Sequence, residues 1–315
     1  MKILVAGATG ALGKQLVPQL VARGHEVAGM TRRESKRDLV TGLGAQPVVA
    51  DALDPDAVAR AVATTEPETI VHQLTALSGS FDIRHIEKTF ALTNRLRTEG
   101  TDNLLAAGRA IGARRFVAQS FGGWPFARTG GAVKTEDDPI DPEPPRALRT
   151  TLAAIRHLEQ AVTSADGIEG VVLRYGGFYG PGTSMALDPE GEQVTAIRAR
   201  KVPLVGDGGG VWSFVHVTDA AAATVLAVDG GAPGIYNVVD DSPAPVREWL
   251  PAAAEALGAK PPRRIPRWIG RLAAGEAAAV MMTETRGASN AKAKRELGWQ
   301  PSHTSLWESL AAEGG

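Results

Sequence analysis

The chain lacks several residue types and spacings that mark particular kinds of site. None of its 315 residues is cysteine, which excludes disulfides, thiolate zinc sites, iron–sulfur clusters and cysteine nucleophiles, and fits a reducing cytoplasm. Six residues are histidine, but no His-x-x-x-His pair occurs, so a histidine-based metal site is not expected. Only three residues are tyrosine, so few phenol groups are available as an acid or a base.

Charge and hydropathy exclude two classes of partner. The 34 lysines and arginines nearly balance the 35 acidic residues, giving a net charge of −1, so no basic field attracts nucleic acid or an anionic membrane. The longest apolar runs, such as Ala220 to Val228, are far too short to span a bilayer. The sequence therefore predicts a soluble, cytoplasmic protein that acts on a small molecule and has neither nucleic acid nor membrane as a partner.

Short apolar runs alternate with amphipathic stretches over the first 180 residues. This alternation predicts an α/β fold with a doubly wound parallel sheet. After Gly180 the pattern loosens, and a strand at 211–217 is expected to return to the main sheet. The predicted main domain comprises residues 1–180 and 211–239, and a smaller C-terminal substrate-binding lobe comprises residues 181–210 and 240–315. Strands are expected at 2–6, 26–30, 46–50, 69–73, 115–119 and 170–174, and helices at 11–23, 34–43, 56–63, 86–111, 148–163, 192–200 and 220–228.

Three glycines, Gly7, Gly10 and Gly13, mark the junction between the first strand and the first helix. Gly7 permits the tight turn, Gly10 lets the backbone approach a pyrophosphate, and Gly13 lets helix and strand pack closely. The phosphate would lie on free N–H groups at the helix N-terminus, where the dipole favours negative charge. The main domain is therefore predicted to be a dinucleotide-binding Rossmann domain. The same loop contributes Thr9, Ala11 and Leu12 to the predicted cofactor site.

The spacing G-x-x-G-x-x-G resembles that of the extended and atypical short-chain dehydrogenase/reductases. Further stretches resemble this family in the same order, so the resemblance covers nearly the whole chain. They are V-A-D at 49–51, G-T-D-N-L-L at 100–105, R-F-V-A-Q-S at 115–120, Y-G-P-G at 179–182, F-V-H-V-T-D at 214–219 and E-L-G-W-Q-P at 296–301. The resemblance implies nicotinamide-cofactor contacts at Asp51, Ala52, Leu74, Thr75, Gln119, Tyr175, Gly177 and Phe178, and a homodimer formed through helices 86–111 and 148–163 is one expectation.

The end of the second predicted strand indicates which cofactor is bound. An NAD-specific site has an acidic residue there for the ribose hydroxyls. Here the strand ends in Thr31, Arg32 and Arg33. Thr31 can hydrogen-bond a 2′-phosphate, and Arg32 or Arg33 can pair with it. NADP(H) is therefore the expected cofactor; the alternative is a solvated basic stretch, since Lys36 and Arg37 follow.

The usual catalytic pair of the resembled family is missing. That family uses Tyr-x-x-x-Lys, in which the tyrosine is the acid or base and the lysine lowers its pKa and holds the nicotinamide ribose. No tyrosine here has a lysine four residues later. Counting back eight residues from Glu159 puts Thr151 in the tyrosine position and Ile155 in the lysine position. The family's helix-four asparagine is matched by Arg97.

Few residues could replace the missing acid. Tyr175, just after the sixth strand, is expected to supply the proton, and Ser120, at the end of the fifth, to hold the substrate oxygen. Trp124 and Thr151 complete the predicted substrate pocket, whereas His216 is expected to be structural. Three functions remain open. The sequence favours an NADP(H)-dependent oxidoreductase with a non-standard proton donor over an epimerase with tightly bound cofactor or a non-catalytic NADP(H) sensor.

Overall fold

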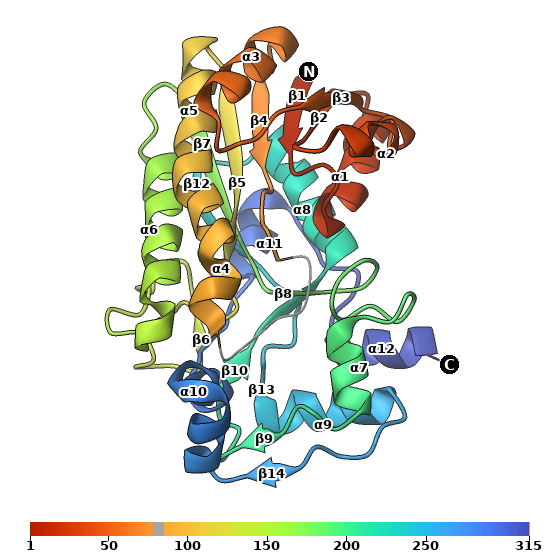
Figure 1. Cartoon of the computed structure of the whole chain (residues 1–315), viewed down its shortest axis with the longest axis vertical. Helices are drawn as coiled ribbons and strands as arrows, with labels where there is room; N and C mark the ends of the chain where they lie inside the picture. Colours follow the sequence, from red (N-terminus) through yellow and green to blue (C-terminus); the bar gives the residue numbers. More distant parts are fainter. Residues whose placement is uncertain (78–84, 315) are drawn as a thin grey trace.

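A seven-stranded parallel sheet forms the centre of the computed structural model, which describes residues 1–77 and 85–314 (Figure 1). The order β12-β7-β5-β4-β1-β2-β3 confirms the predicted doubly wound α/β fold. The direction of winding reverses between β1 and β4, and ligands of such sheets bind outside the carboxyl ends of the strands at this point. The strands are β1 (Lys2–Ala6), β2 (Glu26–Thr31), β3 (Gln46–Val49), β4 (Thr69–His72), β5 (Arg115–Phe121), β7 (Glu169–Tyr175) and β12 (Gly234–Val238).

Helices cover both faces of the sheet because their apolar residues recur at helical spacing. Leu12, Leu16 and Leu20 form one buried stripe, which packs with α8 against one face. On the other face a second core joins Val58, Leu104 and Leu158. The first layer contains α1 (Ala11–Ala22), α2 (Arg37–Gly42), α8 (Val217–Asp229) and α11 (Ala291–Leu297), and the second contains α3 (Pro55–Thr65), α4 (Ile86–Arg95), α5 (Thr101–Ala110) and α6 (Arg149–Thr163).

The helix predicted at 86–111 contains a local irregularity. A π-helical turn at Leu96–Gly100 lies between α4 and α5 and packs against α6. π-Helical turns are rare and occur frequently at functional sites. This turn lies on the helix that follows β4, next to the point where the winding of the sheet reverses.

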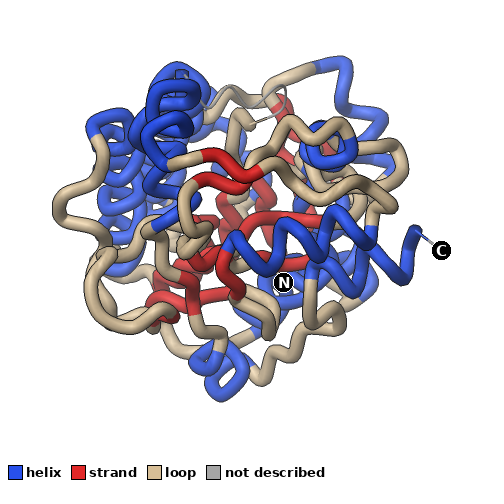
Figure 2. Tube along the Cα trace, turned by 90° about the horizontal axis from the view of Figure 1, so that it is seen from below, coloured by secondary structure: helices blue, strands red, loops and turns tan. Residues whose placement is uncertain are grey.

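The C-terminal part of the chain builds a lobe with its own core. Val194, Trp249, Leu250 and Leu310 belong to this core, which lies below the main sheet in Figure 1. Seen from below, strands lie near the centre of the molecule and helices lie around them (Figure 2). The lobe helices are α7 (Glu192–Arg198), α9 (Val246–Ala256), α10 (Arg267–Thr283) and α12 (Leu306–Gly314). Among the described residues, no helix combines the length and apolarity needed to cross a membrane.

The expectation that residues 211–217 return to the main sheet is wrong. This segment breaks at Ser213, whose carbonyl accepts the Gly177 N–H and whose hydroxyl accepts the Ala288 N–H. These bonds hold the segment between the main sheet and the lobe, and β12 takes the outer position of the sheet instead. Four small sheets result: β8 (Gly177–Tyr179) with β11 (Phe214–His216), β10 (Val211–Trp212) with β13 (Ala244–Pro245), β9 (Leu204–Val205) with β14 (Arg264–Ile265), and β6 (Val133–Lys134) with β15 (Gly287–Ala288).

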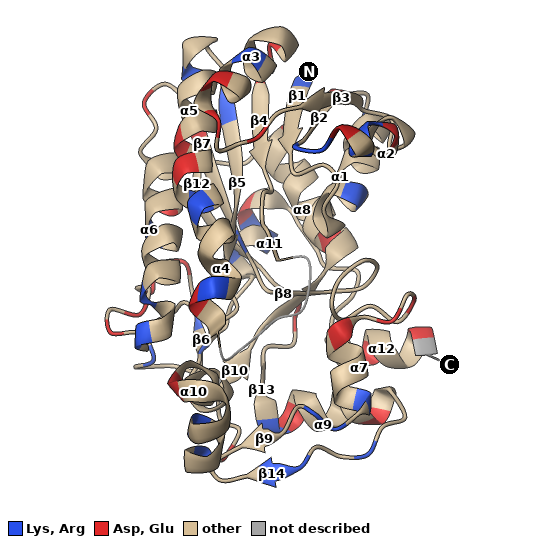
Figure 3. Cartoon of the chain, in the orientation of Figure 1, with Lys and Arg blue, Asp and Glu red and all other residues tan. Residues whose placement is uncertain are grey.

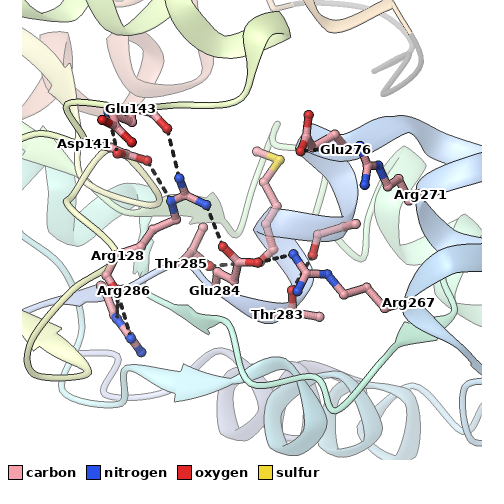
Figure 4. Close-up of polar contacts among 12 residues, drawn as sticks. Arg128, Asp141, Glu143, Arg267, Arg271, Glu276, Thr283, Glu284, Thr285 and Arg286 are labelled. Carbon is pink, nitrogen blue, oxygen red and sulfur yellow. Dashed lines mark hydrogen bonds and ion pairs between the residues drawn. The ribbon is translucent and has the colours of Figure 1, made fainter.

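An ion-pair network joins the loop after β5 to the end of α10 (Figure 4). Arg128 Nε lies 2.9 Å from Asp141 Oδ2, and its Nη1 lies 2.5 Å from Glu284 Oε2. Glu284 also pairs with Arg267, and Arg286 donates to the Arg128 carbonyl. Charge-assisted bonds of this kind hold a fixed geometry. The network fastens the lobe to the main domain beside the carboxyl edge of the sheet.

Candidate cofactor and substrate site

The glycine turn is crowded at Gly7 and Gly13 and open at Gly10. Gly7 has φ +99°, and a Cβ there would lie 2.8 Å from the Gln73 carbonyl oxygen. A Cβ on Gly13 would lie 2.3 Å from the Gly7 carbonyl oxygen. At Gly10, by contrast, the only atom near a Cβ is the Gly7 oxygen, at 3.4 Å. Gly10 also caps α1 without a side-chain hydrogen bond, so the first N–H groups of the helix are free to bind an anion.

The remaining residues predicted to contact cofactor lie along one edge, because they follow the carboxyl ends of adjacent parallel strands. The turn after β3 is held by the Asp51 carboxylate, which accepts the Leu53 N–H at 3.0 Å, and by Asn103, which donates to the Ala52 carbonyl at 2.9 Å. Across the edge, a Cβ on Gly182 would lie 4.0 Å from that of Ala11. The edge brings together Thr31, Asp51, Ala52, Leu74, Thr75, Gln119, Gly177 and Phe178.

Arg32 and Arg33, directly after β2, have exposed side chains. Thr31 is buried at the strand end, and its hydroxyl accepts the Arg33 N–H at 3.4 Å. In the described part of the chain, neither Arg32 nor Arg33 forms an ion pair, whereas Arg37 lies 3.5 Å from Glu34. Figure 3 shows positive charge along this segment beside the sheet edge. Two guanidinium groups are therefore available to a ligand there.

Tyr175 does not face the crevice, which corrects the expectation that it supplies a proton. Its side chain is 1% exposed and belongs to the core on the α1/α8 face. The hydroxyl lies 2.6 Å from Thr224 Oγ1 on α8 and accepts from Gln73 Nε2 at 3.4 Å. Burial raises the pKa of this phenol well above its ordinary value of 10.0. Tyr175 is thereby held as a core residue.

Ser120 is also engaged elsewhere, so the expectation that it holds the substrate oxygen is not supported. Its hydroxyl donates to Glu159 Oε1 at 2.7 Å, underneath α6. The same carboxylate accepts two bonds from Arg174, at 2.8 and 2.7 Å. Both members of this ion pair are nearly fully buried. The three residues form a buried bidentate network that fixes α6 to β5 and β7.

Thr151 and Ile155 lie on the buried face of α6. Thr151 is 1% exposed, and its hydroxyl accepts from Asn94 Nδ2 at 3.1 Å. Asn94 therefore makes the contact between α4 and α6, although the sequence spacing points to Arg97 instead. Asn94 is near the end of α4, and the π-helical turn begins two residues later, at Leu96. Ile155 is fully buried and provides no charge.

Aromatic side chains form one wall beside the end of β5. Trp124 is half-buried, with its ring centroid 6.2 Å from that of Phe90 and 5.4 Å from that of Phe121. Leu152 and Met281 belong to the same apolar cluster, which joins α4, α6 and α10. Trp124 thus lies where α4, α6 and α10 meet, and its place in a substrate pocket stays a prediction.

His216, Asp219 and His303 come together without being close in sequence, with ligand atoms within 4.8 Å of one another. The spacing of histidines along the chain did not predict this group. His216 Nδ1 accepts the Thr218 N–H and so caps α8, in line with the structural role expected of this histidine. His303 Nδ1 lies 2.9 Å from Asp219 Oδ2, and the rings of His216 and His303 stack with their centroids 3.7 Å apart. These contacts give the group a structural role in fixing the C-terminal segment to α8.

Several buried polar atoms near the carboxyl edge have no hydrogen-bond partner within the described residues: Gln73 Oε1, Asn94 Oδ1 and Arg97 Nη1. Leaving such atoms unsatisfied is costly, so they fit a site that binds a polar ligand. Sequence reasoning missed Gln73 and Asn94. The position of Gln73 directly after an apolar strand was the available signal.

Comparisons with known proteins agree with this geometry. Residues 3–238 match the NAD-dependent epimerase/dehydratase family. A 3-diazoavenalumate denitrifying reductase from Streptomyces sp is 45% identical over 99% of this chain and 100% of that protein. A 2-alkyl-3-oxoalkanoate reductase from Stenotrophomonas maltophilia is 31% identical over 82% of this chain and 76% of that protein.

A solved structure leads to the same family. The UDP-glucose 4-epimerase of Thermus thermophilus, in complex with NAD, has a TM-score of 0.73 and is 29% identical. The match covers 100% of this chain and 99% of that one. The extent of the family match, the 45% identity and the shared architecture lead to one conclusion: the chain belongs to the NAD-dependent epimerase/dehydratase family.

Proposed function

We propose that this protein is an NADP(H)-dependent reductase that delivers hydride to the diazo-bearing carbon of a small carboxylic acid and releases dinitrogen. The 45% identity to a 3-diazoavenalumate denitrifying reductase, over almost the full length of both chains, supports this choice of reaction. The cofactor is the hydride donor. The chain's own residues bind and orient the two reactants and exclude water.

The observation that carries the proposal is that, in the described part of the chain, each candidate proton donor named above is buried or hydrogen-bonded to another residue. Reducing a carbonyl requires a group that gives a proton to the developing alkoxide. Here Thr151 is an aliphatic alcohol bonded to Asn94, and Ile155 has no charge to lower its pKa. The Tyr175 phenol is buried against α8, and the Ser120 hydroxyl donates to Glu159. A reaction that needs no general acid fits these contacts best.

Hydride reduction of a diazonium group is such a reaction. The carbon accepts a hydride, the C–N bond breaks, and its electron pair leaves with dinitrogen. The cation is discharged by the hydride itself, so no proton is consumed. The wall formed by Trp124, Phe121 and Phe90 suits a flat apolar ring. Excluding water from the bound ring would protect its electrophilic carbon from hydrolysis.

We call the glycine turn at Gly7, Gly10 and Gly13 and the neighbouring carboxyl ends of the strands the glycine edge. The cofactor expected there is NADP(H) rather than NAD(H). Thr31 ends β2 where an acid would select NAD, and Arg32 and Arg33 are exposed beside it. A 2′-phosphate offers oxygen acceptors to both guanidinium groups. The Gly10 position and the uncapped start of α1 suit the pyrophosphate.

The test is to incubate purified protein with NADPH and an aryl diazonium carboxylate. We expect enzyme-dependent NADPH oxidation with one dinitrogen and one arene formed per cofactor. A reaction without protein, and one with the Gly10→Val variant, measure the background. Ketone reduction is the second candidate, because of the 31% identity to an oxoalkanoate reductase. If β-keto acids are turned over and the diazonium compound is not, the first proposal is wrong.

A further inference from the structure

Arg97 is a buried cation without a counter-charge of its own. It is 4% exposed, and its Nη1 has no hydrogen-bond partner among the described residues. In the same part of the chain no ion pair includes it. The nearest acid that influences it, Glu159, is already bound to Arg174 and Ser120. A guanidinium carries only donors, so leaving it unsatisfied in the interior costs considerable free energy.

The location of Arg97 shows what could satisfy it. It belongs to the π-helical turn, which packs against α6 next to the end of β4. The positive charge of Arg97 contributes, after burial, to the lowered pKa of His72, the last residue of β4. Asn94, three residues earlier, donates a hydrogen bond to Thr151, so the helix contacts α6 close to the turn that contains Arg97. His72 Nε2 lies 3.2 Å from the Leu96 carbonyl oxygen and 3.1 Å from Thr101 Oγ1, which places the turn beside the carboxyl end of β4.

We propose that Arg97 donates hydrogen bonds to the hydroxyl oxygens of the nicotinamide-side ribose. It thereby supplies, from the neighbouring helix, a cation that α6 does not provide at Ile155. Ribose hydroxyls are good acceptors, and their binding would satisfy the buried donors. The inference rests on the proposed cofactor but not on the proposed substrate. Arg97 is accordingly a positioning residue that sets where the reactive ring of the cofactor lies.

Binding measurements without substrate test this assignment. Two ligands are compared by calorimetry: NADPH, and adenosine 2′-phosphate 5′-diphosphate, which lacks the nicotinamide riboside. Arg97→Met should weaken NADPH binding roughly ten- to a hundredfold, the range of a charged hydrogen bond, and leave binding of the fragment within about twofold. Arg97→Lys should retain most of the NADPH affinity. Arg174→Met removes another buried arginine and should leave the ratio of the two affinities unchanged.

A double variant that moves the positive charge from the π-helical turn to α6 makes the test stricter. The double variant Arg97→Met/Ile155→Lys removes the positive charge of Arg97 and places a new one on α6. NADPH affinity should then recover at least partly, which a purely structural role for Arg97 does not predict. Equal loss for NADPH and fragment in Arg97→Met, or unchanged NADPH binding, overturns the proposal. If Arg97→Met does not fold, Arg97→Lys decides: selective retention of NADPH supports the proposal, and parallel loss of both ligands contradicts it. Either outcome leaves the diazo reduction to be judged separately.

Discussion

The glycine edge and the seam between α4 and α6 are built on different principles. The edge consists of backbone: an open position at Gly10, free N–H groups on α1, and strand ends in register. The seam consists of side chains: Thr151 accepts a hydrogen bond from Asn94, Ile155 is buried, and Arg97 lies in a π-helical turn. Cofactor binding can therefore be expected to follow family rules, whereas chemistry need not.

The difference also separates binding from proton transfer. A backbone cradle tolerates varied side chains around it, so the family's cofactor site can persist while its acid is lost. The seam lacks a titratable hydroxyl but retains a cation close by, in Arg97. Under the proposed function, a hydride is positioned there without a proton being delivered. The following variants break or sharpen this contrast, beginning with the largest expected effect.

Gly10→Val should abolish the function of the edge while leaving the fold intact. A Cβ at Gly10 meets only one atom, at 3.4 Å, so the turn accommodates it, but the side chain fills the space of the pyrophosphate. We expect NADPH affinity to fall by at least about a hundredfold, or about 2.7 kcal/mol. Calorimetry measures this, and Gly42→Ala, at an exposed helix end, is the control. Micromolar binding by a folded Gly10→Val protein would contradict the edge as described.

Glu159→Ala should damage the seam through stability. It leaves Arg174 buried without its carboxylate and Ser120 without an acceptor. Breaking one partner of a buried pair costs about 3–5 kcal/mol. Urea unfolding measures the loss, with Glu99→Gln, in an exposed pair with Arg95, as the matched surface control. A loss no larger than that of the control would show that the network does not hold α6.

Acid should weaken the protein through His72, which links seam and edge. Its Nε2 lies 3.2 Å from the Leu96 carbonyl, and its Nδ1 accepts the Leu74 N–H, so the neutral ring satisfies both neighbours. Burial lowers its pKa from 6.5 to about 4. The unfolded chain therefore binds a proton that the folded chain refuses. The free energy of unfolding should fall as pH drops from 6.5 to 4, by up to about 3 kcal/mol.

The measurement for His72 is urea unfolding at several pH values. His72→Gln should show a flatter dependence across this window than the parent chain, and His157→Gln, at an exposed histidine, should show the same slope as the parent. An unchanged slope in His72→Gln would assign the acid sensitivity to other groups.

Arg32→Ala should change cofactor preference rather than turnover. Its guanidinium is exposed and has no acidic partner among the residues that the structure describes, so its removal affects mainly a 2′-phosphate. The ratio of NADPH to NADH affinity should drop by about tenfold, because a charged hydrogen bond contributes about 1.5–3 kcal/mol. Arg37→Ala, whose parent side chain pairs with Glu34, is the control. Equal affinities for NADH and NADPH in the parent protein would refute the assignment of NADP(H).

The smallest effects on turnover are expected at Tyr175 and Thr151, the two hydroxyl groups that come closest to the family's usual proton donor by position or chemistry. Tyr175→Phe and Thr151→Val should each leave kcat within about tenfold, since true general acids contribute 10²–10⁴-fold. Tyr175→Phe should instead lower the free energy of unfolding by about 1 kcal/mol, through the lost bond to Thr224. A hundredfold loss of kcat in either variant would restore that residue as the acid.

The same two regions explain what the sequence could predict. Gly7, Gly10 and Gly13 specify backbone geometry directly, so the turn and the helix after it follow from local rules, whereas the place of residues 211–217 outside the main sheet does not. Ser120 and Tyr175 were misplaced because the face to which a strand-end side chain points depends on strand pairing and on partners such as Glu159 and Thr224. Asn94 was missed because the motif match assigns the asparagine position to Arg97, and no spacing rule shows which residue of this helix contacts Thr151.

The central claim is that the site transfers a hydride without transferring a proton, and deuterium tracing tests it most directly. The diazonium substrate is reduced once with NADPH carrying deuterium on the transferred position in ordinary water, and once with unlabelled NADPH in heavy water. Our account predicts one deuterium on the product carbon from the cofactor and none from the solvent. Deuterium entering that carbon from heavy water, or an initial rate that falls severalfold in heavy water, would contradict it.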